Sequence, residues 1–73
     1  MKQYKGYYIG EGCFNNEKEV DEFLITQAIE AYKMAVKLFA ERRTVENAIY
    51  CEEKAERLVN QFGFTWEQVE AIA

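Results

Sequence analysis

The sequence contains no histidine, no proline and only two cysteines in 73 residues. The commonest metal ligand and the commonest general base of enzymes are therefore both missing. Neither Cys13 nor Cys51 has the usual base of a cysteine nucleophile, and the sequence holds neither a glycine-rich phosphate loop nor a serine-centred elbow. We therefore expect a protein that is not an enzyme and has no catalytic residue, no metal site and no cofactor.

Long apolar runs are also missing. Purely apolar stretches such as residues 23–25 are far shorter than the roughly 20 residues that cross a bilayer. The opening residues Met1 to Tyr4 do not resemble a secretory signal. We therefore expect a cytoplasmic protein without a membrane partner, in which Cys13 and Cys51 are reduced and act as small buried hydrophobic side chains.

An excess of positive charge is the third absence, since the formal net charge is -4. An acidic chain gains nothing from phosphate neutralisation, so nucleic acid is a disfavoured partner. Hydrophobic residues make up 49% and aromatic residues 15% of the sequence, which is the composition of a folding chain. A chain of 73 residues forms one domain, residues 1–73, and chains of this size often need oligomerisation for stability.

Residues 3–9 are rich in strand-favouring aromatics and contain Lys5-Gly6, which predicts a short β-hairpin with a tight turn. Either Asn15 or Asn16 can cap a following helix, and Asn16 with Glu19 has the spacing of a capping box. The helix is predicted from Glu17 to about Arg42, because this stretch lacks glycine and proline. Acidic residues crowd its start, as the helix dipole prefers.

The apolar residues of this predicted helix form two adjoining stripes that together cover roughly 240° of its circumference. The first stripe consists of Val20, Phe23, Leu24, Ala28, Ala31, Ala35 and Leu38. The second consists of Ile25, Ile29, Tyr32, Val36 and Phe39. A helix with so wide an apolar surface must be covered on at least two sides.

A second helix is predicted from a Thr44 cap to Phe62, with Gly63 as its left-handed stop. Thr65 and Gln68 have capping-box spacing and predict a short third helix. The predicted fold is therefore mostly α within the α+β class. A short N-terminal β-hairpin packs on a long helix, which is followed by a second helix and a short C-terminal third helix.

Residues 58–72 resemble the helix-turn-helix family over its turn, with Gly63 at the turn and Phe62, Phe64, Val69 and Ile72 at the buried positions. The resemblance implies a transcriptional regulator. The third helix, however, offers Glu67, Gln68 and Glu70 and no lysine or arginine, whereas a reading helix needs cations for phosphates.

The whole chain resembles, in general style, the small accessory proteins of bacteriophages and mobile elements of Gram-positive bacteria. The shared features are a tyrosine-rich hairpin, a capped amphipathic helix, an acidic balance and no active site. The resemblance implies a protein that binds and modulates a host or phage protein. Some members of that class inhibit nuclease-based defence. An acidic mimic of nucleic acid is therefore an alternative, with an edge formed by Glu46, Glu53, Glu67 and Glu70.

The leading hypothesis is a noncatalytic protein-protein interaction module that forms a homodimer. Tyrosine is frequent at binding hot spots, because it joins a large apolar body to a polar tip. One hairpin and two further helices would leave part of the long helix open, and a two-fold dimer would cover it. The expected partner-binding residues are Tyr4, Tyr7, Tyr8, Ile25, Ile29, Tyr32 and Val36.

Overall fold

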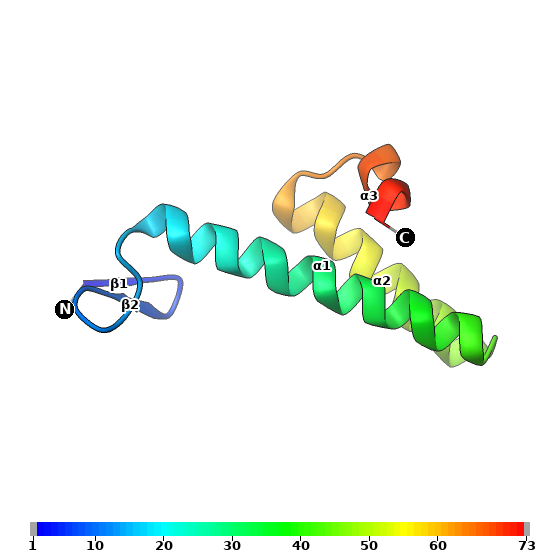
Figure 1. Ribbon diagram of the computed structural model, residues 1–73. Coiled ribbons are helices and arrows are strands. Elements are labelled where there is room, and N and C mark those ends of the chain that lie inside the picture. The colour runs from blue at the N-terminus through cyan, green and yellow to red at the C-terminus, as the bar shows by residue number, and fades with distance from the viewer. Residues whose placement is uncertain (1, 73) are drawn as a thin grey trace.

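The computed structural model describes residues 2–72 and contains one two-stranded sheet and three helices. The strands are β1 (Lys2–Tyr4) and β2 (Tyr7–Ile9), and the helices are α1 (Glu17–Glu41), α2 (Val45–Phe62) and α3 (Trp66–Ile72). Figure 1 shows the hairpin at the N-terminal end of α1, with α2 returning along the C-terminal part of α1 and α3 folding back at the end of α2. The predicted fold class and element order are confirmed.

The hairpin is antiparallel and pairs Lys2 with Ile9, Gln3 with Tyr8 and Tyr4 with Tyr7. Its two-residue turn places both Lys5 (φ 50°) and Gly6 (φ 85°) in the left-handed region. A turn of this kind matches the twist of the flanking strands. Glycine reaches that region without strain, whereas lysine does not.

The start of α1 is capped as the sequence predicts, with one difference. The Asn16 side chain accepts a hydrogen bond from the Glu19 amide at 2.9 Å. The Glu19 carboxylate, however, accepts from the backbone amide of Asn15 at 2.6 Å and does not close the box on Asn16. The helix ends at Glu41, one residue before the predicted Arg42, whose extended backbone (φ -139°) breaks the helix.

The α2–α3 junction follows the sequence closely. Gly63 takes a left-handed conformation (φ 75°) and stops α2, while its amide donates to the Val59 carbonyl. Thr65 and Gln68 then form a reciprocal capping box: the Thr65 amide donates to Gln68 Oε1 at 2.9 Å, and the Gln68 amide donates to Thr65 Oγ1 at 3.1 Å. The third helix therefore starts at a turn that its own sequence specifies.

The molecule has one main core, which lies where α1, α2 and α3 meet. The main core consists of Ala28, Tyr32, Ala55, Leu58 and Val69. The overall shape is elongated, with extents of 45 × 22 × 15 Å. The radius of gyration is 14.7 Å, against about 11 Å for a compact chain of this length.

Candidate protein-binding surface

The three hairpin tyrosines that were expected to bind a partner lie in different environments. Tyr4 and Tyr7 form a cross-strand pair and both are half-buried, whereas Tyr8 is exposed beside Gln3 on the opposite face of the hairpin. The Tyr4 hydroxyl donates to the Asp21 carboxylate at 3.3 Å. Tyr4 and Tyr7 therefore hold the hairpin on α1, and Tyr8 is the hairpin tyrosine that a partner reaches most easily.

Two lysines of the hairpin pair with acidic residues in the first turns of α1. Lys2 Nζ lies 2.9 Å from Glu17 Oε1, and Lys5 Nζ lies 2.8 Å from Asp21 Oδ1. The hydrogen bond from Lys5 holds the pKa of Asp21 below its usual value, and the same bond raises the pKa of Lys5. From the sequence, these acidic residues were expected only to complement the helix dipole, and their contacts with the hairpin were not predicted.

A small aromatic cluster joins the hairpin to α1. The ring of Tyr7 meets Phe14 and Phe23 edge-on, each at 5.7 Å between centroids, and Phe14 lies 5.4 Å from Phe23. We call Tyr7, Phe14 and Phe23 the hairpin cluster. The main core and its half-buried neighbours include no residue of the hairpin cluster, so the two apolar groups occupy separate stretches of α1.

Four of the expected partner-binding residues, Ile25, Ile29, Tyr32 and Val36, form the helix strip that a dimer was expected to cover, and this strip is largely covered within the chain. Tyr32 is only 7% exposed in the main core, and Ile29 and Val36 pack against that core. Ile25 is half-buried. The prediction of an open strip is wrong for Tyr32, because α2 packs on this side of α1 and α3 adds Val69 to the same core.

A different strip of α1 stays partly exposed, beside the residues that pack in the main core. Its members recur at helical spacing along one row of the helix: Gln27, Ala31, Met34 and Leu38. Met34 is 57% exposed and Leu38 is 39% exposed. We call these four residues the α1 outer strip. Met34 was not predicted as part of an apolar stripe, although it follows Ala31 by three residues and precedes Leu38 by four, a spacing that places it on this row.

The outer face of α2 combines apolar and acidic side chains. Val45 is 75% exposed and Ile49, one turn later, is 51% exposed. Four exposed glutamates surround them along the helix: Glu46, Glu52, Glu53 and Glu56. Within residues 2–72, no lysine or arginine forms an ion pair with these four carboxylates. We call these six residues the α2 outer face.

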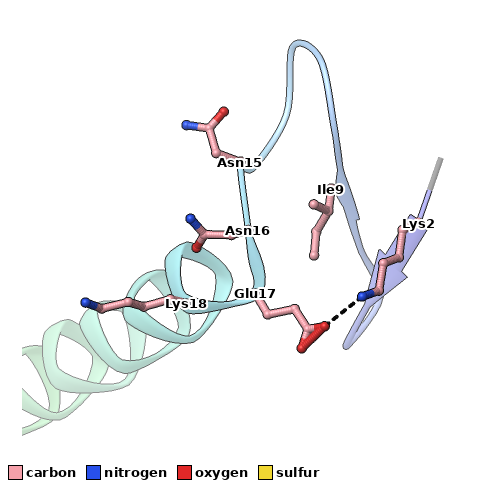
Figure 2. A pocket seen from close by; sticks show the side chains of 6 residues that line it. All are labelled: Lys2, Ile9, Asn15, Asn16, Glu17 and Lys18. Atoms are coloured by element: carbon pink, nitrogen blue, oxygen red, sulfur yellow. Dashed lines mark hydrogen bonds and ion pairs between the residues drawn. The ribbon is translucent and has the colours of Figure 1, made fainter.

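Two open hollows flank α1. One, of about 450 Å³, lies between the hairpin and the start of α1. Figure 2 shows Ile9 and Lys2 facing Glu17 across it, with the ion pair between Lys2 and Glu17. The other, of about 470 Å³, lies at the α1–α2 turn beside Leu38 and Asn47.

The cysteines differ in their surroundings. Both are free thiols, but Cys13 is exposed whereas Cys51 is half-buried and packs against the main core. The prediction of a buried Cys13 is wrong, because the loop between β2 and α1 turns this side chain to solvent. In the part of the chain that the structure describes, no three acidic or cysteine side chains gather in a way that could hold a metal ion.

Tyr32 is the core residue with a distinctive titration. Burial raises its pKa above the ordinary value, and the nearby Cys51 and Glu70 add to the effect.

The third helix carries Glu67, Gln68 and Glu70 on exposed positions, as expected from the sequence. No helix within residues 2–72 is both long and apolar enough to cross a membrane. No family model matches the chain, and comparisons with curated proteins and with solved structures found no significant similarity.

Proposed function

We propose that this chain is a noncatalytic protein-binding module that self-associates as a homodimer and presents a second surface to another protein. The observation that carries the proposal is the amount of open surface on an elongated fold. The accessible surface is 5478 Å², whereas a compact monomer of this mass exposes about 4,700 Å². The excess of roughly 800 Å² matches what one partner contributes to a standard protein interface.

The α2 outer face supports binding to a protein other than the chain itself. Val45 and Ile49 offer an apolar centre, and the glutamates around them favour a partner that carries lysine or arginine. Opposite charges speed the encounter, while burial of the apolar pair supplies affinity. A basic protein with exposed apolar residues is therefore the partner class that this face fits.

Capture from a host cell lysate on the immobilised protein tests this proposal when two matched variants are compared. Ile49→Ser removes an exposed apolar side chain from the α2 outer face, and Tyr8→Ser removes one from the hairpin. We expect Ile49→Ser to lose a basic protein that the unmodified chain and Tyr8→Ser both retain. The opposite pattern would move the site to the hairpin. If both variants capture the same proteins as the unmodified chain, the proposal is contradicted.

An acidic mimic of nucleic acid is a second candidate, and the row of glutamates on α2, which pair with no lysine or arginine within residues 2–72, favours it. In that case the captured partner binds nucleic acid through the same surface, so an excess of duplex DNA should release it from the immobilised chain. If the partner stays on the immobilised chain in the presence of excess DNA, the mimic is excluded and the simple binding module remains. A helix-turn-helix regulator instead requires salt-sensitive retention of the chain itself on DNA, which the glutamates of α3 oppose.

The likeness to phage and mobile-element accessory proteins belongs to the same proposal. It supports a host protein as the target and the cytoplasm as the site of action. Reduced cysteines would agree with that location, and Cys13 and Cys51 are free thiols in the structure.

A further inference from the structure

On the basis of the binding function above, we propose that the α1 outer strip is the homodimer interface and that the second copy packs on it antiparallel. The strip of Gln27, Ala31, Met34 and Leu38 has spacings of four, three and four residues. This alternation is the seam of a two-helix coiled coil. Met34 and Leu38 are exposed in the monomer, so a second helix reaches them without displacing any element of the fold.

Side-chain sizes along the strip fit an antiparallel register. In an antiparallel pair of helices, the residue numbers of facing residues always add to the same value. A register in which Ala31 of one copy faces Met34 of the other therefore also places Leu38 opposite Gln27. Each seam contact then sets a larger side chain against a smaller or more flexible one. A two-fold axis near residues 32 and 33 generates both contacts twice, which closes the dimer.

Charges beside the strip fit the same register. Glu30 and Lys37 lie one heptad apart on one flank of the strip, and both are exposed. In an antiparallel pair, Glu30 of each copy comes close to Lys37 of the other, giving two opposite-charge contacts across the dimer. Self-complementary charge of this kind is what an interface between identical chains requires.

The hairpin excludes the parallel alternative. It packs on Phe23, which precedes Gln27 by one turn on the same row of α1, so it occupies the N-terminal end of the face that carries the strip. Figure 1 shows this end of α1 with the hairpin, and the remainder of α1 leading away from it. Two parallel copies would bring both hairpins to one place, whereas antiparallel copies keep them at opposite ends.

Sedimentation equilibrium on the full chain, from about 1 to about 100 μM, tests the interface. We expect twice the mass of one chain for the unmodified protein and the mass of one chain for Met34→Glu. Ile49→Glu is the matched control, since it places the same carboxylate on an exposed aliphatic position of α2, and it should remain a dimer. Helical circular dichroism should be the same for both variants, because both positions face solvent in the monomer.

Charge reversal tests the register. Glu30→Lys or Lys37→Glu alone turns two attractive contacts into repulsive ones and should weaken the dimer by about tenfold. The double variant Glu30→Lys/Lys37→Glu should restore it. Failure of this rescue would overturn the antiparallel register. A monomer mass for the unmodified chain at every concentration would overturn the interface itself, whereas the lysate experiment would still decide whether the chain binds another protein.

Discussion

At the scale of single residues, Tyr32 joins all three helices, since it lies in the main core beside Ala28, Ala55, Leu58 and Val69. Its raised pKa means that the folded chain holds the phenol proton more tightly than the unfolded chain does. The resulting stabilisation is fully present below the ordinary tyrosine pKa. It is lost as the pH rises through the pKa of the folded state.

We therefore predict that Tyr32→Phe reduces the alkaline loss of stability. Phenylalanine keeps the ring but has no proton to lose, so the variant should unfold at nearly the same temperature as the unmodified chain at neutral pH and at a higher temperature above the ordinary tyrosine pKa. Thermal melts followed by circular dichroism between neutral and strongly alkaline pH measure this. Tyr8→Phe is the control, because Tyr8 is exposed on the hairpin. Parallel alkaline curves for Tyr32→Phe and the unmodified chain would contradict the prediction.

At the scale of elements, Asn47 joins α1 to α2. Its side-chain amide donates to the carbonyl oxygen of Arg42 at 2.9 Å and also lies 3.4 Å from the Leu38 carbonyl oxygen. Its own backbone amide donates to the Thr44 hydroxyl at 3.1 Å. One residue thus satisfies carbonyls at the end of α1 from the first turn of α2, and it fixes the tight reversal between the two helices.

We predict that Asn47→Ala lowers the free energy of unfolding by about 1 kcal/mol, because the Arg42 carbonyl loses its donor while the Leu38 carbonyl keeps only the Arg42 amide. Asn47→Asp separates this role from a local helix effect. A carboxylate in the first turn of a helix is favoured by the helix dipole, so a purely local effect would make Asp stabilising. Repulsion from the Arg42 carbonyl should instead make Asp at least as destabilising as Ala. Urea denaturation measures both variants, and a stabilised Asn47→Asp would refute the bridging role.

Sequence reasoning succeeded where a structure depends on neighbouring residues. The turn at Lys5-Gly6, the cap at Asn16 and the reciprocal box of Thr65 and Gln68 are local, and all three form as predicted. Neighbouring residues alone do not show which side of α1 the second helix covers. Periodicity gives two apolar stripes, but the direction in which residues 42–44 turn decides which of them α2 covers. The contacts of Lys2 and Lys5 with α1 were missed for the same reason, because they depend on how the hairpin folds back.

At the scale of the whole molecule, α1 carries two separate apolar groups. The hairpin cluster holds its first turns to the hairpin, and the main core holds its C-terminal part to α2 and α3. Regions that share few buried contacts open independently of each other. The molecule should therefore open at the hairpin without losing the three-helix core.

We predict that Phe14→Ala loosens the hairpin end alone. Amide hydrogen exchange should become faster in residues 2–24 and remain unchanged around Leu58, because Phe14 contacts Tyr7 and Phe23 but no residue of the main core. Leu58→Ala is the comparison, since Leu58 is fully buried and its truncation should cost about 2–5 kcal/mol across the three helices. Equal acceleration at both ends in Phe14→Ala would show that the chain opens as a single unit.

The position of Trp66 gives the protein an optical property of its own. It is the only tryptophan of the chain, it is the first residue of α3, and its side chain is 52% exposed. The emission of an indole ring depends on the access of water to it, and light that excites tryptophan selectively does not excite the five tyrosines. The fluorescence of the native protein therefore reports on the docking of the C-terminal helix, and it does so without any added label.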